Sequence, residues 1–138
     1  MNNNKQILQP AGWAQPRGYA NGVAASGRQV FVAGQIGWNE RCEFDSDDFI
    51  AQVRQTLLNI RAVLAEAGAA PEHIVRMTWY LIDKHEYIAR GREVGQAYRE
   101  VLGRDYGIAM SAVQVAALME DRAKVEIEVT AVVPAAAP

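Results

Sequence analysis

Residues 45–68 carry the clearest structural signal in this sequence, an apolar stripe at helical spacing. The stripe consists of Phe49, Val53, Leu57, Ile60 and Leu64. These positions lie on one face of an α-helix. Residues 46–48 offer a hydroxyl and two carboxylates for capping its first turn, while Gly68 and Pro71 favour its end. A helix with a single apolar face must bury that face against another element, so we expect it to cover a sheet.

Runs rich in β-branched and aromatic residues predict strands on both sides of this helix. In chain order we expect strands over 19–25 and 29–33, the helix, a strand over 74–82, a second helix over 87–102, and strands over 109–118 and 124–133. Gly27 suits a hairpin turn between the first two strands. Gly91 and Gly95 weaken the second helix. The strand over 74–82 is apolar on both faces, which is typical of a central strand.

The order β-β-α-β-α-β-β predicts an α+β fold with one mixed sheet and both helices on one face. We expect a single domain over residues 1–138, with an ordered core over about 18–133. The other face of the sheet carries apolar positions that the chain has no further elements to cover. We therefore expect the chain to associate with copies of itself.

Charge, hydropathy and the few cysteines and histidines limit which partners, cell compartments and cofactors we expect for this chain. The formal net charge of the 138 residues is −2, and the lysines and arginines form no basic stripe, so we expect neither nucleic acid nor an anionic membrane as a partner. No apolar run approaches the roughly 20 residues that span a bilayer, and the polar N-terminus does not resemble a signal peptide. We expect a cytoplasmic protein. Cys42 is the only cysteine, and His73 and His85 are far apart, so we expect no disulfide, metal or cofactor.

Several short motifs, in this order and spacing, resemble the RidA/YjgF family, also called endoribonuclease L-PSP proteins. They are GQI at 34–36, QVRQTLLNI at 52–60, AEAG at 65–68 and VEIE at 125–128. The resemblance extends from about Gly18 to Val133. It implies a chorismate mutase-like fold and a homotrimer with ligand pockets in the clefts between subunits. It also implies hydrolysis of reactive imines and enamines, such as 2-aminoacrylate, to a 2-keto acid and ammonia.

The resemblance also implies roles for individual residues. A glutamate on the last strand positions the attacking water and a tyrosine near the N-terminus assists, which makes Glu126 and Tyr19 the candidate catalytic residues here. The arginine that binds the substrate carboxylate in deaminating members is replaced by Met110, and an assisting serine is replaced by Ala33. An asparagine that is common on the second helix aligns with Gly95.

These replacements predict a more apolar ligand cleft around Glu126. The side chains expected to bind substrate there are Arg17, Ala33, Trp38, Met110 and Ala112. Without the arginine, a substrate carboxylate loses a charge-assisted hydrogen bond, a loss of about 1.5–3 kcal/mol. We therefore expect an imine or enamine that is not a standard 2-imino acid. Arg17 or Arg28 offers a replacement guanidinium, and Arg17 is the better candidate because it lies two residues before Tyr19.

Other interpretations of the same residues stay open. Met110 is compatible with core packing, and Trp38 with a contact to a neighbouring subunit. Glu126 and Glu128 share one face of a strand, where either is compatible with an ordinary surface role. The main alternative function is a trimer that binds a small molecule without catalysis. RNA cleavage or translation inhibition fits the acidic charge balance less well.

Overall fold

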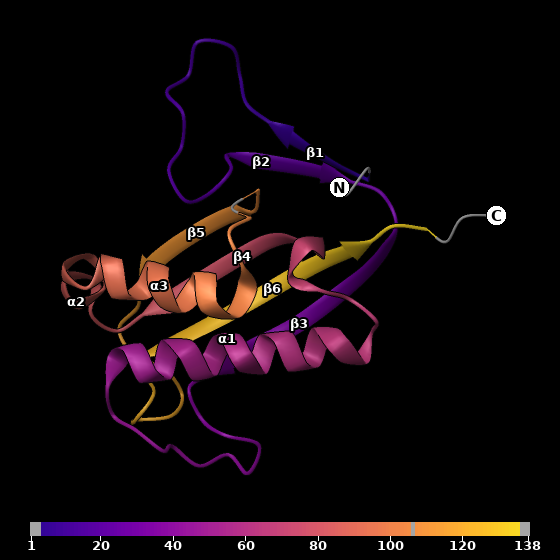
Figure 1. The fold of residues 1–138 in the computed structure, drawn as a ribbon. Helices are drawn as coiled ribbons and strands as arrows, with labels where there is room; N and C mark the ends of the chain where they lie inside the picture. Colours follow the sequence, from indigo (N-terminus) through magenta and orange to yellow (C-terminus); the bar gives the residue numbers. More distant parts are fainter. Residues whose placement is uncertain (1–3, 106, 136–138) are drawn as a thin grey trace.

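A four-stranded sheet with helices on one face forms the body of the molecule (Figure 1). The computed structural model describes residues 4–105 and 107–135. Its elements are β1 (Lys5–Leu8), β2 (Gly22–Ala25), β3 (Arg28–Ile36), α1 (Phe49–Glu66), the short 3-10 helix η1 (Pro71–His73), β4 (Ile74–Leu81), α2 (Lys84–Ala89), α3 (Gly91–Leu102), β5 (Ala109–Gln114) and β6 (Val125–Val133). Within the described part of the chain, no helix is long and apolar enough to cross a membrane.

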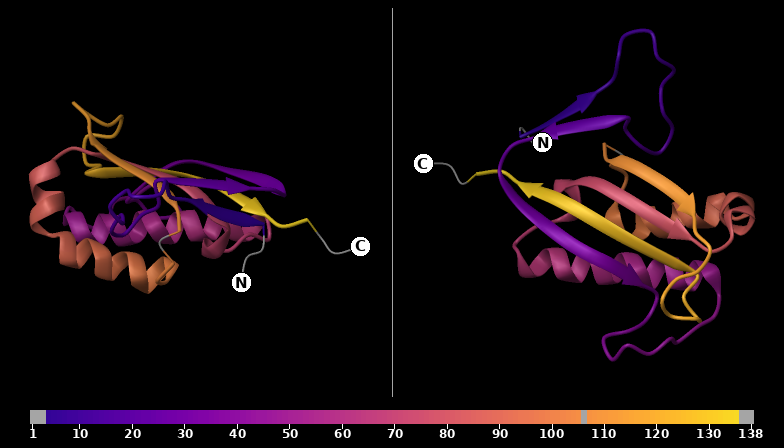
Figure 2. Two further views of the ribbon diagram at one scale, coloured as in Figure 1. Left: turned by 90° about the horizontal axis from the view of Figure 1, so that it is seen from above. Right: turned by 180° about the vertical axis from the view of Figure 1, so that it is seen from behind.

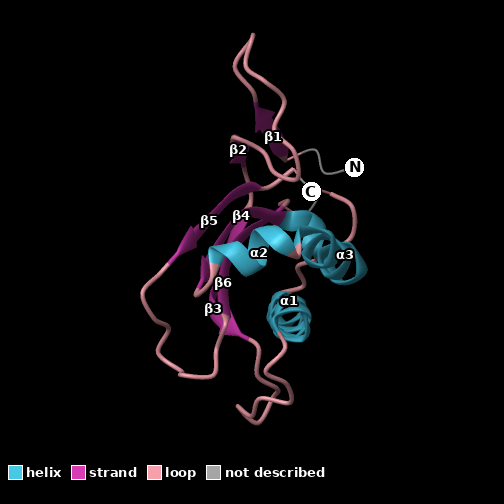
Figure 3. Cartoon of the chain, turned by 90° about the vertical axis from the view of Figure 1, so that its left-hand side faces the viewer, coloured by secondary structure: helices cyan, strands magenta, loops and turns pink. Residues whose placement is uncertain are grey.

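The main sheet has the strand order β3-β6-β4-β5, with β4 and β5 parallel and the other pairs antiparallel. This confirms the predicted α+β class and the mixed sheet. β4 lies between β5 and β6, so the last two strands of the chain are not neighbours. Met77, Trp79 and Leu81 of β4 are buried under the helices. Figures 2 and 3 show that the helices all lie on one side of the sheet, which leaves its other face open in a single chain.

α1 forms where the apolar stripe predicts it, and each of the five stripe residues is at most 3% exposed. The helix begins after Asp48, whose carboxylate accepts a hydrogen bond from the backbone N–H of Ala51 at 3.0 Å. It ends before Gly68, which has a φ of 68°. The buried face of α1 packs on β3, β6 and α3. The structure therefore confirms the helix and its packing face, with Phe49–Glu66 lying inside the predicted segment 45–68.

The single helix predicted over 87–102 is instead two helices, α2 and α3, that meet at Arg90. Asp83 caps α2 and accepts hydrogen bonds from the backbone N–H groups of His85 and Glu86. The Arg90 guanidinium donates to Asp48 at 3.0 Å and to Glu93 at 2.8 Å. The break thus places Arg90 against the N-terminus of α1, a long-range contact that local periodicity does not indicate.

The predicted hairpin between residues 19–25 and 29–33 is wrong. β2 pairs with β1 in a separate two-stranded sheet, whereas β3 pairs with β6. Gly27 does mark a sharp turn, with a φ of 141°, and a side chain there would collide with the carbonyl of Val133. Regular structure also begins at Lys5, earlier than the expected start near Gly18.

The two-stranded sheet lies beside one end of the main sheet (Figure 1). The Lys5 ammonium donates to the carbonyl of Ile74 at 2.8 Å, and the Asn4 side chain donates to the carbonyl of Val132 at 3.2 Å. The backbone N–H of Ala20 donates to the carbonyl of Ile108 at 2.8 Å, just before β5. These bonds bring the segment that precedes β2 to the edge of the main sheet.

Candidate ligand-binding site

A cleft of about 280 Å³ lies between α3, the start of β5 and the segment before β2. It brings together two residues that the sequence singled out, Arg17 and Met110. The remaining lining residues are Gly18, Trp79, Tyr87, Gly91, Val94, Gly95, Tyr98 and Arg99. Most of this wall is aromatic or apolar, and burial raises the pKa of the Tyr87 hydroxyl above its ordinary value. The cleft therefore suits a small, mostly apolar organic molecule.

The two arginines proposed as replacements for the family arginine have different positions. Arg17 lines the cleft together with Met110. Arg28 lies elsewhere and donates a hydrogen bond to the carbonyl of Ala67, at the end of α1, at 2.6 Å. Of these two arginines, only Arg17 stands where it can contact a ligand beside Met110.

Glu126 lies on the open face of the main sheet. Its neighbours Val125 and Ile127 are fully buried toward the helices, so the alternation of β6 directs Glu126 to the opposite side. The half-buried carboxylate lies directly over Gly34 of β3, where an added Cβ would collide with it. Among the described residues, the Glu126 side chain has no hydrogen-bond or ion-pair partner, so its oxygens are available to a water or a ligand.

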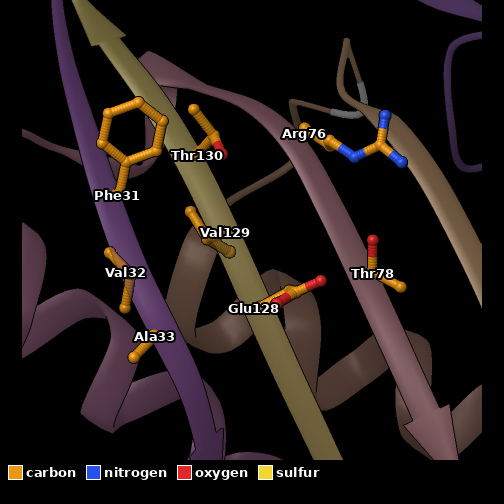
Figure 4. Close-up of a pocket in the computed structure, with 8 residues that line it drawn as sticks. All are labelled: Phe31, Val32, Ala33, Arg76, Thr78, Glu128, Val129 and Thr130. Carbon is orange, nitrogen blue, oxygen red and sulfur yellow. The ribbon is translucent and has the colours of Figure 1, made fainter.

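A second hollow, a groove of about 400 Å³, runs over the same open face (Figure 4). Ala33 lines it together with Phe31 and Glu128. The Tyr80 hydroxyl donates to Glu128 at 2.6 Å, and this hydrogen bond raises the pKa of Tyr80. Because Glu128 is engaged in this way, Glu126 is the more available of the two carboxylates on this strand face.

Met110 and Glu126 do not meet within one chain. Met110 is the register partner of Met77, which is buried under the helices and pairs in turn with Val129. Glu126 instead pairs with Tyr80, further along β4 and on the other face. The expectation that both residues line one cleft therefore does not hold in a single chain, because the sheet separates them.

The other predicted site residues line neither hollow among the described residues. Trp38 packs within its own loop, with the centroid of its ring 5.8 Å from that of Phe44. Its backbone carbonyl accepts a hydrogen bond from the Asn59 side chain. Tyr19 is 41% exposed, one residue beyond the cleft lining. Ala112 lies exposed on β5 as the register partner of Trp79.

Sequence reasoning missed Arg99 as a cleft residue. The signal was present, because Arg99 follows Gly95 by four residues and so lies on the same face of α3. As for metals, residues 4–105 and 107–135 contain no group of three or more His, Cys, Asp or Glu side chains placed to hold an ion.

Comparison with known proteins settles the family. The family model described as Endoribonuclease L-PSP matches residues 13–133. The chain belongs to the RidA/YjgF family. A RutC family protein of Synechocystis is 34% identical over 131 residues, which cover 94% of this chain and 97% of the relative. A RutC family protein of Aquifex aeolicus is 33% identical and covers 83% of this chain and 87% of the relative.

Solved structures of Rid proteins share the fold. YyfB of Yersinia pestis, described as a Rid family protein of unknown function, superposes with a TM-score of 0.82 at 31% identity, covering 94% of this chain and 99% of YyfB. Rv2704 of Mycobacterium tuberculosis, described as a YjgF/YER057c/UK114 family member, gives a TM-score of 0.62 at 36% identity, with 84% and 87% covered. The Rid fold thus accounts for nearly the whole chain.

Proposed function

We propose that this Rid protein hydrolyses a reactive imine or enamine to a carbonyl compound and ammonia, in clefts between the subunits of a homotrimer. The observation that carries the proposal is the unengaged Glu126 carboxylate, held over Gly34 on the open face of the sheet. The Met110 cleft lies on the other face, so a second copy of the chain is needed to complete a site that contains both. Phe31, which is 72% exposed on the open face, supports association through that face.

In the proposed reaction Glu126 acts on water. It accepts a proton from water while the water oxygen bonds to the imine carbon, and the electrons of the C=N bond move to nitrogen, which takes up a proton from solvent. The carbinolamine then collapses: its hydroxyl proton passes to solvent, the C=O bond forms, and the C–N bond breaks as nitrogen receives the proton held by Glu126. Imine and water thus give carbonyl and ammonia, with Glu126 returned to its starting state. An enamine enters this path after protonation at carbon.

The substrate class follows from Met110. A thioether offers no charge-assisted hydrogen bond to a carboxylate next to the imine carbon. We therefore propose an imine or enamine without an α-carboxylate, in place of a standard 2-imino acid.

The test compares imines generated in place by an amine oxidase with 2-imino acids generated by an amino-acid oxidase. The wild type is expected to hydrolyse the former faster, and Met110→Arg to shift the preference toward 2-imino acids. Glu126→Gln is expected to lower turnover by roughly 10²–10⁴-fold. The matched control is Glu66→Gln, which changes an exposed glutamate at the end of α1.

Rapid wild-type hydrolysis of 2-imino acids would contradict the substrate class. Full activity of Glu126→Gln would contradict the mechanism, and ligand binding without any turnover would favour the non-catalytic alternative.

A further inference from the structure

Two arginines from distant parts of the chain line the cleft beside Met110. Arg17 comes from the segment before β2, and Arg99 from the last turns of α3. No aspartate or glutamate is among the described residues that line the cleft. The cleft wall therefore carries positive charge on an otherwise aromatic and apolar surface, which favours an anion over a neutral molecule.

Gly95 makes room for one of these guanidinium groups. A Cβ at residue 95 would approach Nη1 of Arg99 to 3.0 Å, tighter than nine in ten real Cβ contacts, so the guanidinium would have to move. The guanidinium thus lies against the surface of α3 at the position where another residue would place its side chain. A larger residue at position 95 would displace Arg99 from this part of the cleft.

Trp79 supplies an independent indication of a ligand. It lines the cleft, is 1% exposed, and its indole N–H has no hydrogen-bond partner among the described residues. Buried donors in folded proteins are nearly always paired, so this one points to an acceptor that residues 4–105 and 107–135 do not provide. The Trp79 ring also meets Tyr87 edge to face, with centroids 5.8 Å apart, and such aromatic surface suits a flat apolar body.

We propose that this cleft binds an organic anion, with Arg17 and Arg99 holding its acid group and the aromatic wall holding a flat apolar body. This inference rests on the proposed function, which supplies the imine or enamine end of the ligand, and it adds the acid group at the other end. The substrate is an imine or enamine whose acid group lies away from the imine carbon, where Arg17 and Arg99 reach it and Met110 does not. Arg99 is then a specificity-determining residue of this chain.

The test uses 3-phenylpropanoate and its neutral counterpart 3-phenylpropanamide as probes in calorimetric titrations of the full chain. The wild type is expected to bind the acid at least tenfold more tightly than the amide. Arg17→Met and Arg99→Met each weaken acid binding by roughly tenfold or more and leave amide binding unchanged. Gly95→Asn has the same effect as Arg99→Met. Arg92→Met removes an exposed charge from the same helix and is the matched control.

Equal binding of acid and amide would overturn the proposal, as would wild-type affinity for the acid in both arginine variants. Circular dichroism melts of each variant separate loss of binding from loss of folding, and Arg17, on an exposed segment, supplies a variant outside the helix. Glu126→Gln distinguishes the proposed imine hydrolysis from the proposed anion site. This variant is expected to lose imine turnover and to retain acid binding through Arg17 and Arg99. Tight acid binding without imine turnover refutes only the catalytic proposal. Turnover with unchanged acid binding in both arginine variants refutes only the anion site.

Discussion

At the scale of single residues, the proposed reaction depends on where Glu126 lies. Its carboxylate occupies space that only glycine at position 34 leaves free, and this glycine begins the GQI motif of the family resemblance. Gly34 is not one of the described glycines that have a positive φ. Position 34 therefore requires glycine for space and not for an unusual backbone conformation. The glycine of this motif is therefore explained by the close approach of the Glu126 side chain to the strand.

This explanation predicts the effect of Gly34→Ala. The added methyl group would push the Glu126 carboxylate away from β3, and misplacement of a catalytic group by about 1 Å lowers turnover by up to roughly 10²-fold. We expect kcat for imine hydrolysis to fall by at least about tenfold, with a melting temperature close to that of the wild type. In the double variant with Glu126→Gln, Gly34→Ala should have no further effect on kcat. A full additional loss there would show that Gly34 acts independently of Glu126.

The sequence indicated some of these residues and missed others for a physical reason. Position in the chain alone favours Arg17 over Arg28, and Arg17 does line the cleft beside Met110. Trp38 lines neither hollow in a single chain and its ring packs on Phe44 in the same loop, so its contact with a ligand stays a prediction. Contacts of this kind depend on how a loop folds back on itself, which residue type and spacing do not specify.

At the scale of elements, local patterns predicted what local interactions determine. α1 has its apolar stripe, its cap and its terminating glycine within one continuous segment, and its position was predictable. The pairing partner of β2 was not predictable, because a short strand carries little information about which of several strand edges it pairs with. The break at Arg90 was also missed, because it depends on Asp48, which is distant in sequence and belongs to another helix.

The contact between Arg90 and the N-terminus of α1 predicts a pH dependence of stability. The backbone N–H of Ala51 and then the Arg90 guanidinium hold the pKa of Asp48 below its ordinary value. A carboxyl group with a lowered pKa in the folded state stabilises the fold above its unfolded pKa of about 3.9. That contribution is lost as the pH falls through the folded-state pKa.

We therefore expect the melting temperature to fall on acidification below about pH 4, and to fall less steeply in Asp48→Asn, which keeps a capping side chain without the titrating group. Because Asp48 is largely exposed, the difference should be small and should shrink at high salt. Thermal melts at neutral and acidic pH measure this difference in melting temperature between Asp48→Asn and the wild type, with Asp47→Asn as the neighbouring control. Identical acid profiles for Asp48→Asn and the wild type would contradict the assignment.

At the scale of the whole molecule, the sheet divides the site. Its helix-covered side presents the cleft with Met110, Arg17 and Arg99, and its open side presents Glu126. The sequence predicts a sheet face left uncovered within one chain, and the structure has such a face, whereas its coverage by a second copy stays a prediction. Sequence reasoning did not anticipate that the candidate residues separate into two groups on opposite faces, because that follows from strand register.

The division makes the proposed assembly testable with two variants that damage different halves of the site. Met110→Glu places a carboxylate in the cleft, and Glu126→Gln removes the proposed base, so each homotrimer is expected to be inactive. Co-expression with two different affinity tags and sequential purification on both tags isolates the hybrid trimers. If each site combines the cleft of one subunit with Glu126 of the next, every hybrid retains one intact site of three.

The measurement is the rate of imine hydrolysis by these purified hybrids beside both parent variants and the wild type. If neighbouring subunits share each site, hybrids of the two inactive parents are expected to show about a third of the wild-type rate per trimer. Hybrids as inactive as their parents, in preparations shown by mass to be trimers of both chains, would contradict the claim that neighbouring subunits share the catalytic site.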